Sequence, residues 1–415
     1  MSSPHRSPLW LTASPSRRRF LKLAGLFSGA VALSTSNVGC QGTGSQQVSE
    51  SARDTVKSGG IVRVGYLPIT DSAPLLVAHD KGFFRNEGLE SDRPAPYRSW
   101  KAIAKAFMEG QVNVIHILMP ASLWLRYRLN FPAKVVAWNH TNGSAITVHP
   151  SIKHPEQLGG RTIAIPFWYS IHNVVLQLLL KKHGLKSVSS LALNRRLAPD
   201  EVGLVVLPPP DMIKALSNED IAGYIVAEPF NSAAETARVG RLLRLTGDIW
   251  RDHACCVVLM HETDLRDRPN WSQSVVNAIV KAQQWSRGNR PELAHLLSKN
   301  GSNYMPQSVD VLDRILNRYS NDFYRNEGAI HHPEWRSRRI DFQPYPFPSY
   351  TMDLVKTLKN TLLDESGTFV QDLDPNVVAQ DLVDSQFVTR AINLVGGPQA
   401  FSLPADLLRS ETLEI

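Results

Sequence analysis

The first residues suited to binding chemistry are Thr70, Asp71 and Ser72. They follow the apolar run 61–67, whose β-branched residues predict a buried strand. Pro74 next suits the first turn of a helix, which Lys81-Gly82 would end. A strand that leads directly into a helix leaves N–H groups and hydroxyls free at its carboxyl end, where a small, often anionic, ligand can bind. The alternative is an ordinary βα unit in which these residues only cap the helix.

His172 is the second candidate, in the first turn of a helix expected over 171–183. The positive end of the helix dipole disfavours an imidazolium, so we expect a neutral His172 that donates one hydrogen bond to an oxyanion. The alternative is a histidine at the surface or at the edge of the core. Just before it lie the aromatic residues 167–169, and Trp168 among them could equally wall an apolar part of a ligand.

Signatures of catalysis are not found in the sequence. It has no G-x-S-x-G elbow, no H-E-x-x-H, no P-loop and no dinucleotide fingerprint, so we expect no enzyme and no cofactor. His331-His332 with Glu334 is a poor metal site because adjacent histidines point in different directions, and we expect no metal. Cys255 and Cys256 are adjacent, which strains a disulfide, so we expect two buried, inert thiols.

The basic charge of the chain is concentrated at its start. The 415 residues carry a net charge of +7, but the five basic residues of 1–39 occur with no acid, and removing them leaves a net of +2. No Lys/Arg run with interleaved aromatic residues is present, which argues against nucleic-acid binding.

Residues 1–39 have the features of an export signal. Ser16 to Lys22 (SRRRFLK) matches the twin-arginine pattern, and the apolar segment 23–33 is too short to span a bilayer. Val38-Gly39-Cys40 resembles a lipoprotein cleavage box, although Asn37 stands where Leu is usual, so lipidation of Cys40 and simple signal cleavage are both open. Residues 40–60 are a flexible Gly/Ser/Gln-rich tether. We therefore expect a periplasmic protein anchored to the inner membrane.

The remaining chain alternates strands and helices, which predicts an α/β fold with parallel-rich sheets flanked by helices. Its length predicts two domains. We assign 61–150 with about 255–415 to lobe 1, and 151–254 to lobe 2, with crossings near His149-Pro150 and over 245–254. The helical C-terminal third is expected to pack on the first lobe, and the helix over 272–287 is expected to face solvent.

Five segments in order resemble the solute-binding proteins of nitrate/sulfonate/bicarbonate ABC transporters. The resemblance spans roughly 61–300 and rests on GYLPITDSAPL (65–75) with KGFF (81–84), GGRTIA (159–164), VLPPPDM (206–212), GYIVAEPF (223–230) and DIWRDH (248–253). It implies a two-lobe, type II periplasmic-binding-protein clamshell with a ligand cleft between the lobes.

The same resemblance extends the list of ligand-binding residues. In the nitrate binders a tryptophan at the position of Trp100 and a histidine at that of His172 line the cleft, and the loop Asn142, Gly143 and Ser144 is similar to another cleft edge. For Trp100 the alternative is a core aromatic residue. Glu228, at a strand end before Pro229, also enters the list, although this position more often shapes the edge of the lobe.

One departure from the family pattern concerns charge. The nitrate binders have a lysine shortly after the segment matched by 248–253, where this chain has Ala254-Cys255-Cys256. A lysine would pair directly with an anion. We therefore expect capture of a small anionic or polar solute (nitrate, bicarbonate, cyanate or sulfonate class) by lobe closure, for delivery to an ABC permease and its ATPase. The alternatives are a ligand sensor for a signalling partner, a binder of an alkylsulfonate or pyrimidine precursor, and an extracytoplasmic enzyme on this fold.

Overall fold

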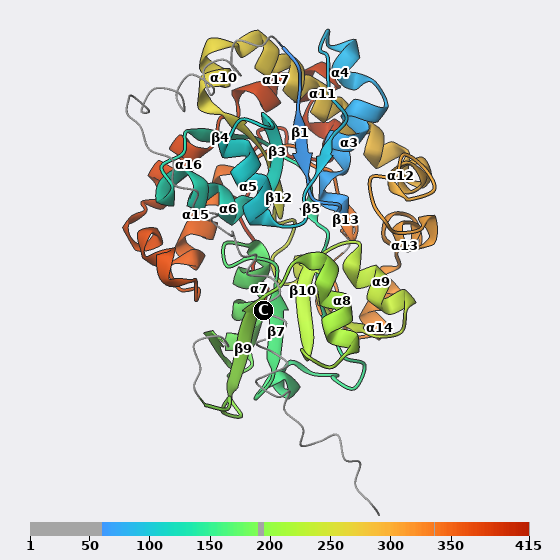
Figure 1. The fold of residues 1–415 in the computed structure, drawn as a ribbon, viewed down its shortest axis with the longest axis vertical. Coiled ribbons are helices and arrows are strands. Elements are labelled where there is room, and N and C mark those ends of the chain that lie inside the picture. Colours follow the sequence, from blue (N-terminus) through green and yellow to red (C-terminus); the bar gives the residue numbers. More distant parts are fainter. Residues whose placement is uncertain (1–59, 190–194, 336, 415) are drawn as a thin grey trace, which may run out of the picture.

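The computed structural model describes residues 60–189, 195–335 and 337–414, which form two lobes, each built on one mixed sheet (Figure 1). The export signal, Cys40 and the tether lie outside these residues. The first sheet has the order β2 (Ala95–Pro96), β1 (Val64–Tyr66), β3 (Val114–Leu118), β12 (Cys256–His261), β4 (Ala133–Trp138). β1 is parallel to β2 and β3, while β12 runs antiparallel to β3 and β4.

The second sheet has six strands in the order β11 (Arg241–Leu245), β6 (Ser144–Val148), β10 (Gly223–Ala227), β7 (Thr162–Ile165), β9 (Glu201–Val206), β8 (Lys186–Ser189). β10, β7, β9 and β8 are mutually parallel, and β6 and β11 add the antiparallel edge. A short pair, β5 (Thr141–Asn142) with β13 (Ile340–Asp341), lies between the two sheets. The α/β, two-lobe prediction is confirmed.

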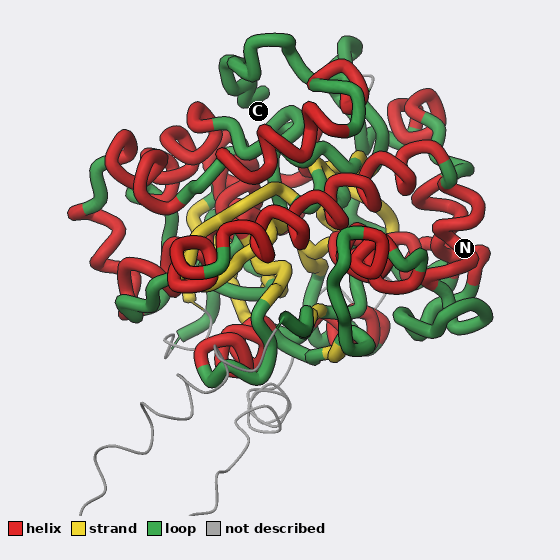
Figure 2. The backbone as a smooth tube through the Cα atoms, turned by 90° about the horizontal axis from the view of Figure 1, so that it is seen from above, coloured by secondary structure: helices red, strands yellow, loops and turns green. Residues whose placement is uncertain are grey.

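Helices surround both sheets, and Figure 2 shows them around the strands of the first. They are α3 (Ala73–Asp80), α4 (Phe83–Asn86), α5 (Trp100–Met108), α6 (Met119–Leu123), α7 (Ile171–Lys182), α8 (Pro209–Ser217), α9 (Phe230–Thr236), α10 (Glu262–Asp267), α11 (Pro269–Gly288), α12 (Arg290–Leu297), α13 (Val309–Leu316), α14 (Asn321–Asn326), α15 (Pro348–Leu358), α16 (Pro375–Leu382) and α17 (Gln386–Leu394). Tighter 3₁₀ turns occupy Thr70–Ser72, Pro155–Leu158, Thr246–Asp248, Glu365–Asp372 and Pro398–Phe401, and Trp124–Arg128 is π-helical.

The chain passes from the first sheet to the second between β4 and β6, and returns between β11 and β12. The return spans residues 246–255. The first crossing comes earlier than His149-Pro150, because β6 pairs along its whole length with β10 of the second sheet. Ser144 therefore belongs to the second lobe, and Asn142-Gly143 forms the connection.

The expectation for the helix over 272–287 is wrong. α11 is largely buried, because it packs against α3 and α17 in the first lobe. Its buried face includes the polar side chains of Ser272, Gln283 and Ser286, all hydrogen-bonded internally. These polar residues hide the apolar stripe that would otherwise mark a core helix.

The C-terminal third contacts both lobes, not the first alone as expected. α16 and α17 pack on β4, but α13 packs on α9 of the second lobe. The Tyr169 hydroxyl, in the second lobe, donates to the Asp364 carboxylate at 2.7 Å. The region thus bridges the lobes, and its strand β13 also pairs with β5 at the first crossing.

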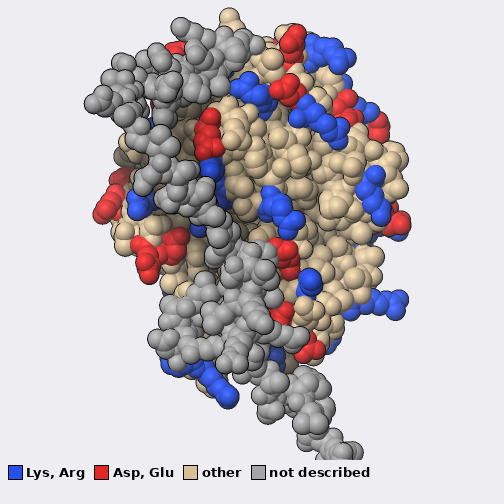
Figure 3. Space-filling model, in the orientation of Figure 1, with Lys and Arg blue, Asp and Glu red and all other residues tan. Residues whose placement is uncertain are grey.

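Within the described residues, no helix is long and apolar enough to cross a membrane. On the part of the surface visible in Figure 3, Lys and Arg side chains are interspersed with Asp and Glu and do not gather into one basic patch.

Candidate functional site

Buried polar side chains concentrate where the two lobes meet. Burying so many polar groups is costly unless they pair with each other or with a ligand. Each of the following is at most 3 % exposed, and they come from strand ends and turns of both sheets: Thr70, Asp71, Ser72, His116, Asn139, His140, Thr141, Asn142, Ser144, His172, Glu228, His253, Cys255 and Cys256.

Asp71 lies at the centre of this cluster, in the 3₁₀ turn between β1 and α3. Its Oδ2 is 2.9 Å from Nε2 of His140, which follows β4, and 3.3 Å from Sγ of Cys256. Burial raises the pKa of Asp71 to about 6 although His140 opposes the shift. Burial disfavours the His140 cation, but Asp71 outweighs it and raises the pKa of His140 to about 10. At neutral pH the two residues therefore form an ion pair with no net charge.

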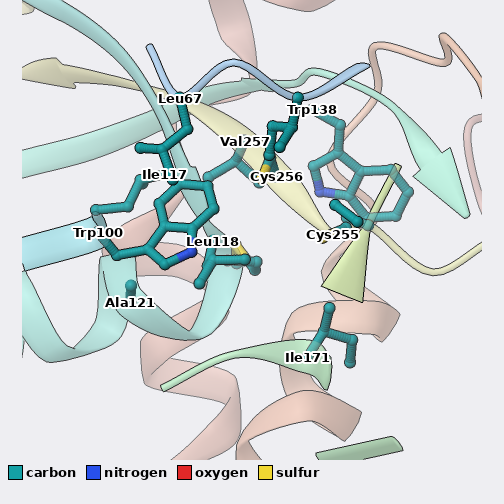
Figure 4. Close-up of a cluster of buried hydrophobic side chains, with 14 of the residues drawn as sticks. Leu67, Trp100, Ile117, Leu118, Ala121, Trp138, Ile171, Cys255, Cys256 and Val257 are labelled. Atoms are coloured by element: carbon teal, nitrogen blue, oxygen red, sulfur yellow. The ribbon is translucent and has the colours of Figure 1, made fainter. Parts of the chain in front are cut away.

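Cys256 begins β12 and Cys255 directly precedes it, and Figure 4 shows both between Trp100 and Trp138. Both thiols are free and buried, as expected. Cys255 Sγ lies 3.7 Å from Nε2 of His172. Burial alone would raise the pKa of Cys255, but hydrogen bonding from Cys256 and the imidazoles of His172 and His140 hold it well below the usual thiol value. Burial and the neighbouring Cys255 and Asp71 raise the pKa of Cys256 well above the usual thiol value, so the two adjacent thiols differ, and their inertness stays a prediction.

His172 reaches the same cluster from the second lobe. It is the second residue of α7, whose N-terminus is capped by Ser170 accepting from Asn173 N at 3.0 Å. Its Nε2 is 2.9 Å from Oγ of Ser144 at the start of β6, and its Nδ1 has no partner among the described residues. His172 and Ser144 therefore face Cys255 of the first lobe across the junction.

The Thr70 to Ser72 turn uses its three polar residues differently. Thr70 donates from its backbone N–H (2.9 Å) and its hydroxyl (3.2 Å) to the carbonyl oxygen of Glu228, which joins the lobes. Ser72 donates to the carbonyl of Ile69 at 2.7 Å, inside the turn. Asp71 thus presents its carboxylate to the cluster, and its Oδ1 has no partner among the described residues.

Glu228 contributes its backbone, not its carboxylate, to the contact with Thr70. The carboxylate is fully buried and accepts from Arg339 Nε at 2.8 Å and from the backbone N–H of Ser232 at 3.0 Å. The Glu228 carboxylate is therefore paired with Arg339 and Ser232 and not with Asp71. Its role in the structure is to fix the edge of the second lobe.

The tryptophans and the connecting loop occupy distinct places. Trp100 is 2 % exposed, its ring centroid lies 5.4 Å from that of His116, and its indole N–H has no partner within the part of the chain that the structure describes. Trp168 is half-buried against the core and is the most peripheral of the predicted residues. Asn142 donates to Asp252 at 2.9 Å. Gly143 has a φ of +82°, a backbone conformation that favours glycine, and it turns the chain from β5 into β6.

Sequence reasoning missed His116, His140, His253 and the cysteines. His140 was recoverable, since Asn139-His140-Thr141 directly follows a predicted strand. His116 lies inside β3, where it reads as a core residue; its Nε2 accepts from Leu67 N at 2.8 Å. The cysteines join the cluster only because β12 inserts between β3 and β4.

A separate hollow of about 680 Å³ lies on the surface between α7 and α15, lined in part by Gln177, Lys181 and Lys356. It opens on flexible lysine side chains and lacks the fixed, buried donors of the interlobe cluster. We therefore place the candidate site at the interlobe cluster.

Comparisons with known proteins agree with this architecture. A model of the NMT1-like family matches residues 60–298. Nitrate/nitrite binding protein NrtA of Nostoc sp. is 25% identical over 407 residues, covering 88% of both chains. The crystal structure of the periplasmic nitrate-binding protein NrtA from Synechocystis PCC 6803 has a TM-score of 0.66 at 18% identity and covers 86% of this chain and 94% of that one.

A ligand-binding component of an ABC-type import system from Staphylococcus aureus, solved with zinc bound, has a TM-score of 0.62 at 20% identity. It covers 80% of this chain and 99% of that chain. The resemblance to this group of binding proteins is thus confirmed, and such relatives serve transport, not catalysis. The chain belongs to the NMT1-like family and has the fold of periplasmic solute-binding proteins.

Proposed function

We propose that the chain captures a small anion of the nitrate, bicarbonate, cyanate or sulfonate class between its lobes and delivers it to the permease. The observation that carries this proposal is the approach of Ser144 and His172, from the second lobe, to Cys255 of the first. Both residues are fully or almost fully buried, so lobe closure encloses whatever they bind.

Charge balance supports neutral donors as the means of holding the anion. Asp71 and His140 cancel one another, Cys255 brings no positive charge, and no lysine stands near Cys256 in the sequence, so these groups offer no free cation. Two indole or amide donors of the cluster, Trp100 Nε1 and Asn139 Nδ2, are buried without partners among the described residues. The N-terminus of α7 adds its dipole behind His172. Hydrogen bonds from fixed donors and a helix terminus can hold an anion without a cationic side chain.

Ligand-induced stabilisation of the purified chain tests the proposal. The panel is nitrate, nitrite, bicarbonate, cyanate, taurine, alkylsulfonates and pyrimidines, each with chelator present. A ligand at 100 times its Kd should stabilise the fold by about 2.7 kcal/mol. No shift with any small anion would refute the anion assignment, while a response only to alkylsulfonates or pyrimidines would favour the larger organic solute.

The site is tested with two histidines at opposite ends of α7. His172→Asn should abolish the ligand response, because it removes the imidazole that meets Ser144. His183→Asn is the matched control, since His183 ends the same helix and contacts Glu156 at the surface. An undiminished response in His172→Asn would refute the site. The remaining candidate contacts, at Thr70, Asp71, Ser72, Trp100, Asn142, Gly143, Trp168 and Glu228, are then ranked by the same measurement.

Export by the twin-arginine route and anchoring through Cys40 complete the proposal. Replacing Arg17 and Arg18 by lysine should retain the chain in the cytoplasm, and Cys40→Ala should release it from the membrane fraction. A Cys40→Ala chain that stays with the membrane would exclude a lipid anchor. Uptake by vesicles carrying the permease and ATPase, dependent on added chain, separates transport from a sensor role.

A further inference from the structure

Four side chains of the first lobe form a group with metal-ligand chemistry. They are Asp71, His140, Cys255 and Cys256, each offering one ligand atom, and these atoms all lie within 4.8 Å of one another. Each residue is fully buried. We propose that this quartet binds a divalent transition-metal ion of the zinc class, which replaces our expectation of no metal.

The spacing of the donor atoms is close to what such an ion requires. Zinc bonds of about 2.0–2.3 Å in a tetrahedral site separate two donors by about 3.3–3.8 Å. In this structure Asp71 Oδ2 is 2.9 Å from His140 Nε2 and 3.3 Å from Cys256 Sγ. Small side-chain rotations would bring all four donors to bonding distance, without moving one lobe against the other.

The kind of donor selects the kind of metal. Two thiolates, one imidazole and one carboxylate match the tetrahedral sulfur and nitrogen sites of zinc. Calcium and magnesium require six or more oxygen ligands or octahedral geometry, which this quartet does not supply. Metal binding requires both thiols and the His140 imidazole to be deprotonated, so zinc affinity should fall as the pH is lowered.

The backbone that carries the ligands is held firmly. Met119 N donates to the Cys255 carbonyl at 2.9 Å, and Gln283 Nε2 donates to the carbonyl of Asn139, next to His140, at 2.9 Å. Fixed ligand segments lower the entropy cost of assembling a metal site. Asp71 Oδ1 and His140 Nδ1 are buried without partners among the described residues. Both atoms are therefore free to form a further hydrogen bond when the ion is bound.

The second lobe contributes none of the four ligands. Ser144 Oγ and His172 Nε2 lie 3.9 and 3.7 Å from Cys255 Sγ, but neither belongs to the group of donor atoms that all lie within 4.8 Å of one another. The ion therefore binds without the proposed anion, and the two sites can be tested separately. Two thiolates and a carboxylate also outweigh a divalent charge, so the filled site does not replace the missing lysine as an anion partner.

The test is a metal titration of the purified, reduced, chelator-treated full chain. Co²⁺ should bind in a 1:1 ratio and give the intense visible bands of tetrahedral cobalt with thiolate-to-metal charge transfer. Zn²⁺ should then displace Co²⁺, while Ca²⁺ and Mg²⁺ should not. Cobalt that shows only weak octahedral bands, or no stoichiometric uptake of either metal, overturns the proposal.

Variants locate the site. Cys255→Ser/Cys256→Ser and His140→Asn should weaken zinc binding at least about 100-fold, by competition with a chromophoric chelator. His183→Asn, distant from the quartet, should retain it. Zinc affinity within threefold of wild type in the double cysteine variant also overturns the proposal.

A measurement of thiol alkylation in the wild-type chain tests the site without relying on the folding of any variant. Zinc should slow alkylation of Cys255 and Cys256, measured on their shared peptide by mass spectrometry. Cys40, in the same unlipidated chain, is the internal control whose alkylation zinc should leave unchanged. Equal alkylation of the pair with and without zinc refutes the site. The solute panel contains chelator, so its outcome tests the anion proposal without any contribution from bound zinc.

Discussion

Arg339 offers the sharpest test of how the C-terminal region joins the second lobe. The side chain is 2 % exposed. Its Nε donates to Glu228 at 2.8 Å, its Nη1 donates to the Tyr324 hydroxyl at 2.6 Å, and Nη2 also contacts Glu228. Burial disfavours the guanidinium charge, but the carboxylates of Glu228 and Glu235 outweigh it and raise the pKa of Arg339.

Replacing Arg339 by alanine would leave the Glu228 carboxylate buried with one donor, the backbone N–H of Ser232. Removing one partner of a buried pair costs about 3–5 kcal/mol, mostly as the penalty of the stranded charge. We therefore expect Arg339→Ala to lose about 4 kcal/mol of unfolding free energy. Chemical denaturation followed by fluorescence and circular dichroism measures this as a lower midpoint at an unchanged slope.

The neighbouring arginine is the matched control. Arg338 is exposed, and Arg338→Ala should change the unfolding free energy by no more than about 0.5 kcal/mol. Adding Glu228→Gln to Arg339→Ala should recover part of the loss, because it removes the stranded charge. A cost below about 1 kcal/mol for Arg339→Ala would refute the assignment of an energetically coupled buried pair.

Three further predictions concern other parts of the molecule. Burial lowers the pKa of His116 to about 3, below the unfolded value of 6.5, so the unfolded state binds the extra proton as pH falls. Stability should fall from pH 6.5 towards 4 by up to about 1.4 kcal/mol per unit, and His116→Gln should flatten this slope in denaturation at several pH values. Tyr169→Phe removes one hydrogen bond to Asp364 and should lower the unfolding free energy by about 1 kcal/mol. An unchanged denaturation midpoint would show that this contact does not contribute to stability. Gly247→Ala places a Cβ 2.2 Å from the Trp335 ring and should cost about 2 kcal/mol or more, whereas a neutral result would mean that the indole moves freely.

Local patterns predicted the first strand-turn-helix unit and the α7 helix start well. The turn at Thr70–Ser72, Pro74 in the first turn and His172 in α7 all depend on neighbours in sequence, so composition and spacing are sufficient. The resemblance to binding proteins predicted that these distant segments meet.

Features that depend on contacts between segments far apart in the sequence could not be predicted from local patterns. β6 joins the second sheet through its register with β10, which no local pattern specifies. Polar residues such as Gln283 made α11 resemble a solvent-facing helix. In the structure Gln283 is buried, and its Nε2 donates to the carbonyls of Trp138 and Asn139 at the end of β4. The Asp71–His140–cysteine quartet likewise exists only because β12 lies between two earlier strands.

The bridge formed by the C-terminal region has a consequence for the rate and range of lobe motion. Val311 and Asp364 each accept a hydrogen bond from the second lobe, and Tyr324 donates one to it. Any opening of the lobes must break or carry along these contacts. Contacts that break on opening stabilise the closed form before the solute binds. They also raise the free-energy barrier that opening must cross before the solute is released. Measured affinity then reports the stiffness of this bridge together with the chemistry of the site.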